Sequence, residues 1–301
     1  VGIAPDGLTK AVFQNSGSEA IDTAIKLVWY YHNAIDKPEK KKIIARVNAY
    51  HGTGIASASL TGLDRMHKAF DLPVTNRVLR TDCPHYYRFG EDGETEEDFA
   101  TRCADNLEKL ILDEGPDTVA AFFAEPVMGA GGVLVPAVTY FEKVQAVLKK
   151  YDVLMVSDEV ICGFGRTGNM WGAQTFGIKP DLLTCAKALS SSYLPISAVL
   201  VSEKIYEGIR DQSGDLGGFS HGYTYSGHPV PAAVAVETLK IYEERDIVGQ
   251  VRNVAPALQD GLQAFADHPL VGEVRGVGLI AGVEVVADKA TKEAFEPSAK
   301  V

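Results

Sequence analysis

Two apolar segments that end beside charged residues limit the possible folds more than any other feature of this sequence. Val153-Leu154-Met155-Val156 is followed by Asp158, and Leu182-Leu183-Thr184-Cys185-Ala186 is followed by Lys187. The residues between the two segments are enough for a loop that leads from one strand to the next. If the strands are parallel, Asp158 and Lys187 face the same crevice, where open α/β sheets bind their ligands.

A carboxylate and a primary amine in one partly buried crevice suit the chemistry of pyridoxal phosphate. The amine of Lys187 can form a Schiff base with an aldehyde, and the carboxylate of Asp158 can hold a pyridine nitrogen in its protonated form. The alternative is structural, because an acid at a strand end is often a turn former and a single lysine is usually a solvated surface charge. The other motifs of the chain favour the cofactor interpretation.

A glycine-rich loop inside the same stretch offers a competing interpretation. Residues 163–168 match the G-x-G-x-x-G fingerprint of dinucleotide-binding proteins, and Asp181 follows at a suitable distance. The fingerprint must open a helix, yet Asn169-Met170-Trp171-Gly172 is typical of a loop, and Asp181 begins an apolar segment instead of ending one. We therefore interpret the match as a loop and keep a nucleotide-dependent oxidoreductase as the alternative.

The composition predicts a large apolar core and argues against polyanionic partners. The chain has 301 residues, of which 46% are hydrophobic, and this length favours roughly two domains. The formal net charge of −11 argues against nucleic acid and anionic membranes as partners. No apolar segment approaches the ~18 residues that a membrane span requires.

Two of the four cysteines, Cys162 and Cys185, lie in or beside apolar segments, which predicts that they are buried free thiols. Cys83, Cys103, Cys162 and Cys185 form no C-x-x-C pair and have no histidine at metal-binding spacing, so we expect no metal site. Buried free thiols fit a reducing cytoplasm, where we expect the protein. The chain begins with Val1-Gly2-Ile3, without Met, and stops just after strand-like residues, which we interpret as a fragment of a longer protein.

Small polar residues precede the first predicted helix. Residues 11–15 form a short strand candidate, and apolar residues repeat at helical spacing over 20–29. Ser16, Gly17 and Ser18 therefore lie at a helix N-terminus, where free N–H groups, the positive end of the helix dipole and two hydroxyl groups can bind a phosphate. An ordinary serine N-cap explains the same residues equally well.

Two further strand ends carry candidate site residues. Tyr50 and His51 follow the predicted strand 43–47, where an aromatic ring can stack on a flat cofactor. Glu125 follows the continuously apolar segment 119–124, which is typical of a strand buried on both faces. The structural alternatives are simple packing of the two rings and a turn carboxylate that binds a loop N–H group.

The remaining pattern predicts a parallel sheet with helices and a separate strand pair. Strand 119–124, a helix with a Thr139-x-x-Glu142 capping box, and strand 153–157 form a βαβ unit. Apolar spacing predicts one long helix from residue 232 to about 265. Residues 272–286 alternate apolar and polar with glycines, and we expect them to form a hairpin outside the main sheet.

Together these motifs resemble the class III pyridoxal phosphate-dependent aminotransferases, a family with the aspartate aminotransferase fold. The resemblance extends over essentially the whole chain, its motifs follow the family's order, and it is greatest for the ω-amino acid and amine:pyruvate transaminase branch. It rests on six segments: Asn15-Ser16-Gly17-Ser18-Glu19-Ala20, Tyr50-His51-Gly52, Ala124-Glu125-Pro126-Val127, Asp158-Glu159-Val160 with the loop 163–168, Ala186-Lys187-Ala188-Leu189 before Pro195-Ile196-Ser197, and Tyr223-Thr224-Tyr225-Ser226-Gly227-His228-Pro229.

The resemblance implies an α/β fold of the fold type I class. Such a fold has a mostly parallel central sheet with helices on both faces, followed by the start of a smaller α+β C-terminal domain. On this basis the large cofactor-binding domain spans residues 1–262, and a truncated small domain spans residues 263–301.

The resemblance also assigns the residues around the cofactor ring. It implies that Lys187 forms the internal aldimine and carries the proton during transamination, and that Asp158 pairs with the pyridine nitrogen. Val160 then packs on one face of the ring, and Tyr50, with His51 beside it, lies on the other face.

The phosphate and substrate ends of the site follow from the same resemblance. Gly17 and Ser18, with Ser16 next to them, bind the phosphate. Thr224 reaches the phosphate of the neighbouring subunit's site, so a homodimer with sites at its interface is implied. Glu125 lies near the substrate end of the crevice, where it can pair with an arginine.

The implied activity is transfer of an amino group from an amine or ω-amino acid to a keto acid, with pyruvate as the expected acceptor. Aminomutase or decarboxylase activity within the same family, and a cofactor-binding fragment without turnover, remain alternatives. The sequence has Ile161 where many members have a glutamine that contacts the cofactor hydroxyl. The family's carboxylate-binding arginine and its N-terminal pocket segment lie outside residues 1–301.

Overall fold

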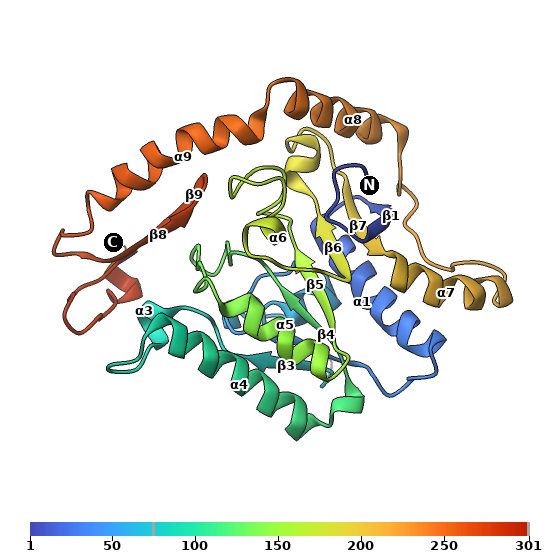
Figure 1. Cartoon of the computed structure of the whole chain (residues 1–301), viewed down its shortest axis with the longest axis horizontal. Coiled ribbons are helices and arrows are strands. Elements are labelled where there is room, and N and C mark those ends of the chain that lie inside the picture. Colours follow the sequence, from blue (N-terminus) through green and yellow to red (C-terminus); the bar gives the residue numbers. More distant parts are fainter. Residues whose placement is uncertain (74–75, 300–301) are drawn as a thin grey trace.

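A seven-stranded sheet forms the centre of the computed structural model, which describes residues 1–73 and 76–299 (Figure 1). The strand order is β1-β7-β6-β5-β4-β2-β3. Strands β2 to β6 are parallel, whereas β7 is antiparallel to β6 and β1 is antiparallel to β7. The predicted mostly parallel sheet is therefore confirmed. The strands are β1 Leu8–Gln14, β2 Lys42–Arg46, β3 Val78–Thr81, β4 Val119–Ala124, β5 Leu154–Asp158, β6 Leu182–Cys185 and β7 Ser197–Ser202.

Helices cover both faces of this sheet, and successive residues of β4 show how. Phe122 packs into the core that contains α4 and α5, and Phe123 packs into the core that contains α1. Side chains that alternate across a strand and are buried on both sides give the continuous apolar pattern seen in the sequence. The helices are α1 Gly17–Ala34, α2 Ile55–Leu60, α3 Tyr86–Phe89, α4 Glu96–Glu114, α5 Tyr140–Lys150, α6 Gly172–Thr175, α7 Glu203–Asp215, α8 Pro229–Glu244 and α9 Ile247–Gln263.

The expected βαβ unit forms from β4, α5 and β5, and β6 lies beside β5 in the same direction. Asp158 is the last residue of β5 and pairs in register with Thr184 of β6. Lys187 follows the end of β6, so both predicted chemical groups lie at the carboxyl edge of adjacent parallel strands.

The capping box predicted at the start of α5 is wrong. Thr139 has the helical backbone angles φ −87° and ψ −5° and makes no capping hydrogen bond. A capping side chain needs an extended backbone at this position. The Thr139 hydroxyl instead donates to Glu97 of the neighbouring α4 at 2.7 Å. A contact between helices therefore takes the place of the local motif.

The single long helix predicted over 232–265 is also wrong, because the segment forms two helices. Between α8 and α9, Asp246 has a left-handed backbone with φ 44°. Its side chain accepts a hydrogen bond from the Gly249 N–H at 3.1 Å and caps α9. The apolar spacing continues through the break, which explains why periodicity alone joined the two helices. Figure 1 shows both running along one side of the molecule.

The glycine-rich loop 163–168 does not form a dinucleotide-binding turn. The next helix in the described chain is α6, which has only 4 residues, and Phe164 and Gly165 have left-handed backbones with φ 61° and 99°. Asp181 binds the β5 backbone, since its carboxylate accepts from the Met155 N–H at 2.9 Å. The fingerprint therefore lacks its helix and its free acid, and the nucleotide alternative is wrong.

A two-stranded antiparallel hairpin lies outside the main sheet, as predicted. It consists of β8 Val271–Val277 and β9 Ile280–Val285. The boundary between predicted domains 1–262 and 263–301 stays a prediction, and residues 300–301 lie outside the described residues. Across 1–73 and 76–299, no helix has the length and apolar character needed to cross a membrane.

Candidate active site

A cavity of about 450 Å³ opens at the carboxyl ends of β5 and β6. This volume lies in the range of about 300–1,000 Å³ that is usual for small-molecule sites. The structure brings nine of the ten predicted site residues to its wall: Ser16, Gly17, Ser18, Tyr50, His51, Glu125, Asp158, Val160 and Lys187. The cavity therefore lies where the sequence predicted it, at the carboxyl ends of neighbouring strands.

Asp158 is fixed by three hydrogen-bond donors. Its Oδ2 accepts from His51 Nδ1 at 2.8 Å, and its Oδ1 accepts from the Val160 N–H and the Thr184 hydroxyl, both at 3.2 Å. A carboxylate offers about four acceptor positions, so capacity remains for one more donor from the cavity. The side chain of Asp158 is buried. A pyridine N–H group is a donor that this free position would accept.

His51 binds the Asp158 carboxylate, which lines the cavity. A carboxylate can only accept, so the hydrogen lies on Nδ1 of His51. Its Nε2 is buried and has no hydrogen-bond partner among residues 1–73 and 76–299. The His51 N–H donates to the Thr61 hydroxyl at 2.9 Å, which anchors the residue at the end of β2. His51 thus orients the carboxylate and also contributes to the cavity wall.

Lys187 has an unusual backbone that projects its side chain from the sheet edge. Its φ is 43°, in the left-handed region. For a residue with a Cβ atom this conformation costs about 1–3 kcal/mol and occurs mostly where function requires it. Ala186 immediately before it is buried, whereas Lys187 itself is exposed at the cavity.

The N-terminus of α1 lies at another wall of the cavity. The Ser16 hydroxyl accepts from the Glu19 N–H at 3.2 Å, so the ordinary N-cap is present. The Ser18 hydroxyl accepts from the Thr53 N–H at 3.0 Å, which leaves its own hydrogen free to donate. The first N–H groups of a helix have no partners within the helix. Gly17 and Ser18 therefore present donors where an anion can bind.

Two glycines allow the cavity wall to close tightly. At Gly52, where φ is 129°, a Cβ atom would lie 2.6 Å from the Ser18 hydroxyl oxygen. At Gly17 it would lie 3.3 Å from the Val160 methyl groups. At Gly52 the close approach is possible only without a side chain, and at Gly17 a side chain would crowd the Val160 methyl groups. Together with the free acceptor position of Asp158, this shape fits pyridoxal phosphate.

Glu125 is buried with both carboxylate oxygens bonded. Oε1 accepts from the Tyr50 N–H and Oε2 accepts from the Gly129 N–H, each at 3.0 Å. Burial raises the pKa of Glu125, and the nearby His51 opposes this effect. Arg46 donates to the main-chain oxygen of Glu125. The carboxylate thus fixes the backbone that carries Tyr50, and its pairing with an arginine side chain stays a prediction.

Thr224 is the one predicted site residue outside the cavity. It is exposed in the segment between α7 and α8 and does not belong to the cavity wall of its own chain. The prediction placed it in a neighbouring subunit's site, and that placement stays a prediction.

Residues that hold Asp158 and the start of α6 in place were not identified from the sequence. Thr184, which donates to Asp158, is a polar residue inside an apolar strand, and this contrast was a usable signal. Glu159 is fully buried and accepts from the Gly172 and Ala173 N–H groups at the start of α6. Burial raises the pKa of Glu159 to about 7, although the two N–H donors oppose the shift.

The loop after Lys187 was missed as well. Ser192, Tyr193, Leu194, Pro195 and Ile196 line the cavity. Ser192 and the preceding residue both have left-handed backbones, at φ 60° and 49°. The sequence of this loop carries no periodicity that would place it, and only its position after a strand end pointed toward the site.

Comparisons with known proteins agree with this geometry. The family model described as aminotransferase class-III matches residues 2–300. The chain is 61% identical over 290 residues to gamma aminobutyrate transaminase 3, chloroplastic, of Solanum lycopersicum, covering 96% of this chain and 56% of that protein. It is 59% identical over 286 residues to gamma-aminobutyrate transaminase 1, mitochondrial, of Oryza sativa subsp. japonica, covering 95% and 55% respectively.

Solved structures match closely too. A transaminase with L-Ala superposes with a TM-score of 0.97 at 60% identity, covering 100% of this chain and 70% of that one. The ω-transaminase from Pseudomonas jessenii in complex with PMP superposes with a TM-score of 0.96 at 57% identity, covering 98% and 65%. These matches confirm the fold type I class.

The expected cytoplasmic localisation is wrong. The two plant relatives above are a chloroplastic and a mitochondrial enzyme. Cys162 and Cys185 are free and buried, as predicted, and Cys83 and Cys103 are free and buried too. Reduced thiols argue only against oxidising compartments and do not separate the cytoplasm from other reducing ones.

The chain spans about half the length of the curated relatives it matches. Class III aminotransferases depend on pyridoxal phosphate, and the cavity described above fits that cofactor. Because the family match extends from residue 2 to residue 300, this chain belongs to the class III aminotransferases.

Proposed function

We propose that this chain is the cofactor-binding part of a transaminase that moves an amino group from an amine or ω-amino acid to a keto acid. One observation carries the proposal: Asp158 and Lys187 follow adjacent parallel strands and line one cavity. The plant relatives named as gamma aminobutyrate transaminases support an ω-amino acid such as γ-aminobutyrate as the donor. Pyruvate is our proposed acceptor.

Pyridoxal phosphate, when bound, supplies an aldehyde that condenses with amines and a ring that accepts electrons from the substrate carbon. The chain's own residues supply the proton chemistry. Lys187 Nζ, on its projecting backbone, takes a proton from the donor carbon and returns it within the same cavity. Asp158 is held by its three donors, and its free acceptor position can keep a proton on the pyridine nitrogen.

The other cavity residues orient the reactants. The α1 N-terminus, with Gly17 and Ser18, binds the phosphate through N–H and hydroxyl donors. Tyr50 and Val160 line the cavity and would contact the two faces of the cofactor ring. Glu125 fixes the Tyr50 backbone through the hydrogen bond to its N–H.

We also propose a homodimer in which Thr224 of one subunit completes the phosphate site of the other. Thr224 is exposed and lies away from its own cavity. An exposed hydroxyl group suits a phosphate oxygen as a donor.

A donor and acceptor screen on the full-length protein tests the proposal. γ-Aminobutyrate, a simple amine and alanine serve as donors, with pyruvate and a second keto acid as acceptors. We expect amino transfer that requires both partners and disappears in Lys187→Ala. Turnover of the donor without any acceptor would support an aminomutase or decarboxylase instead, and cofactor binding without turnover would support an inactive fragment.

A further inference from the structure

Arg275 of β8 joins the hairpin to a loop beside the cavity. Its Nε donates to the main-chain oxygens of Gly132 and Val133 at 3.0 and 3.2 Å, and its Nη2 donates to the Gly132 oxygen at 2.6 Å. The side chain is only 10% exposed. A planar guanidinium holds two adjacent carbonyl groups in a way that a single ammonium group cannot match.

The loop that Arg275 holds, residues 128–134, is called the pocket loop here. Met128 and Leu134 close it through two main-chain hydrogen bonds of 3.1 and 3.0 Å. Gly132 and Val133 near its end have left-handed φ values of 127° and 55°. A β-branched residue in this region is a strained outlier that persists only where its surroundings enforce it. Arg275 binds the carbonyl group of the strained Val133 and that of Gly132 before it.

The pocket loop leads directly to the cavity wall. The Gly129 oxygen accepts from the N–H groups of Gly132 and Val133 at 3.1 and 3.0 Å. The Gly129 N–H donates to Glu125 at 3.0 Å, and Glu125 in turn holds the Tyr50 N–H. Hydrogen bonds thus run without interruption from the hairpin, through Gly129, to two residues that line the cavity.

The pocket loop also sets the width of the cavity at Ile161. A Cβ atom at Gly129 would lie 2.4 Å from the Ile161 Cδ1 atom, so the two residues are already in close contact. Ile161 lines the cavity together with Glu125. A shift of the pocket loop would therefore move both Glu125 and Ile161.

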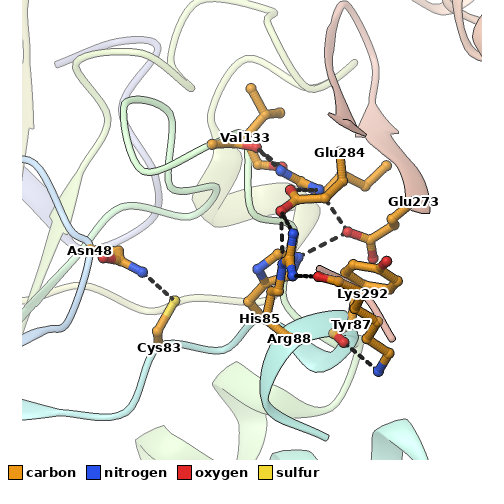
Figure 2. A network of polar contacts seen from close by, with 11 residues as sticks. Asn48, Cys83, His85, Tyr87, Arg88, Val133, Glu273, Glu284 and Lys292 are labelled. Atoms are coloured by element: carbon orange, nitrogen blue, oxygen red, sulfur yellow. Dashed lines mark hydrogen bonds and ion pairs between the residues drawn. The ribbon is translucent and has the colours of Figure 1, made fainter. Parts of the chain in front are cut away.

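Two carboxylates on the far side of Arg275 hold its guanidinium in place, and each of them also contacts a basic residue near α3. Nη1 lies 2.7 Å from Glu273 and 2.9 Å from Glu284. Glu273 also bonds to His85 at 2.9 Å, and Glu284 lies 2.7 Å from Arg88. Figure 2 shows Glu273, Glu284, His85, Arg88 and Val133 in one network of polar contacts. The hairpin is therefore tied both to α3 and to the pocket loop.

We propose that Arg275 is a positioning residue that fixes the substrate end of the cavity by holding the pocket loop. The claim that this affects substrates rests on the proposed transaminase function. The hairpin does not contact the substrate. It fixes the positions of Glu125 and Ile161 because Arg275 holds the carbonyl groups of Gly132 and Val133 in the pocket loop. Lys187 follows β6 and belongs neither to the pocket loop nor to its hydrogen-bond chain, so we expect cofactor attachment to change less than substrate binding.

Amide hydrogen exchange in the full-length protein tests the physical claim without relying on activity. In Arg275→Gln we expect the amides of the pocket loop to exchange about ten-fold faster, because the strained turn opens more often. Arg88→Gln is the matched control, since it removes a guanidinium from the same network and leaves the pocket loop contact intact. Arg275→Lys keeps the charge and the fold but cannot span both carbonyls, so it too is expected to speed exchange.

Steady-state kinetics test the consequence for substrates. Arg275→Gln and Arg275→Lys should raise KM for the amino donor about ten-fold while kcat and the cofactor absorbance change little, and Arg88→Gln should leave KM unchanged. Unchanged pocket loop exchange in both Arg275 variants, or equal acceleration in Arg88→Gln, would overturn the proposal. A wild-type protein that lacks transaminase activity overturns the proposed function instead, and the exchange measurement still decides the role of Arg275.

Discussion

At the scale of single residues, Asp158 depends on partners from three separate parts of the chain. His51 follows β2, Thr184 lies in β6, and Val160 follows Asp158 itself. Each donor limits the rotation of the carboxylate, so its free acceptor position points in one direction. The sequence identified Asp158 from its place at a strand end, but the pairing with Thr184 depends on the register between two strands.

Replacing Asp158 by Asn should separate cofactor attachment from turnover. The amide has no charge to hold a proton at the pyridine nitrogen, so we expect the transamination rate to fall at least about 100-fold, which corresponds to about 2.7 kcal/mol. Thr184→Val removes one supporting donor and should cost only about 1 kcal/mol, or about five-fold. Half-reaction kinetics followed by absorbance measure both. Equal losses in the two variants would contradict the assigned roles.

Glu159 should make the stability of the fold depend on pH. Its pKa is about 7 in the folded protein, against the model-peptide value of 4.5. Between these values the folded state binds more protons than the unfolded state, so the free energy of unfolding falls as the pH rises through this window. The full effect is about 3 kcal/mol.

Denaturant unfolding at pH 5 and pH 7.5 measures this effect, with Glu159→Gln as the comparison. The glutamine does not titrate, so its free energy of unfolding should change less between the two pH values than that of the wild type. At pH 5 the variant should also be less stable, because its NH2 group cannot accept from the Gly172 or Ala173 N–H, whereas both oxygens of the protonated acid can. An identical pH dependence in both proteins would disprove the assignment to Glu159.

At the scale of elements, the apolar patterns predicted the strands, whereas the ends of helices were harder to predict. β4, β5 and β6 are buried on both faces, and their apolar runs are continuous for that reason. The break between α8 and α9 depends on the left-handed Asp246, and the start of α5 depends on a contact with Glu97. Such contacts leave no mark in local periodicity.

Lys40 joins three elements through a buried ammonium group. Its Nζ donates to the main-chain oxygens of Val119, Tyr151 and Asp152 at 3.1, 3.0 and 2.8 Å. Burial lowers the pKa of Lys40, and the nearby Asp152 opposes this effect. The residue thus links the segment before β2 to the start of β4 and to the end of α5.

Replacing Lys40 by Met should destabilise the fold without affecting the cavity. Three carbonyl oxygens lose their donor, and we expect a loss of about 2–4 kcal/mol. Urea unfolding measures the change, and cofactor absorbance at low denaturant serves as the control. Lys37→Met, which removes an exposed pair with Asp152, is the matched surface variant and should cost less than about 1 kcal/mol. A Lys40 variant as stable as the wild type would refute this role.

At the scale of the whole molecule, strand-end residues could be predicted and long-range supports could not. Residues at the carboxyl ends of parallel strands lie at the same edge of a sheet, whatever the conformation of the loops. For this reason the sequence was enough to identify Asp158, Lys187, Glu125 and Tyr50. The contact between Arg275 and Gly132 joins residues 143 positions apart. This contact forms only because the hairpin packs against the pocket loop.

The proposed dimer makes a prediction about Thr224. If its hydroxyl binds the phosphate in a neighbouring subunit, Thr224→Ala should weaken cofactor binding about ten-fold, or about 1.4 kcal/mol. Equilibrium dialysis measures the affinity, and sedimentation velocity on the same samples gives the oligomeric state. Ser213→Ala, on α7 and outside the cavity wall, is the control. Unchanged affinity in a dimer, or a monomeric protein with full affinity, would rule out the shared site.

The lysine that binds the cofactor covalently is the central residue of the proposed site. Reduction of the full-length protein with borohydride in the presence of pyridoxal phosphate fixes the cofactor to its lysine, and peptide mapping by mass spectrometry then identifies that residue. We predict that the label lies on Lys187 and that Lys187→Ala carries none. A label on another lysine, or an unlabelled Lys187 in the wild type, would contradict the proposed site.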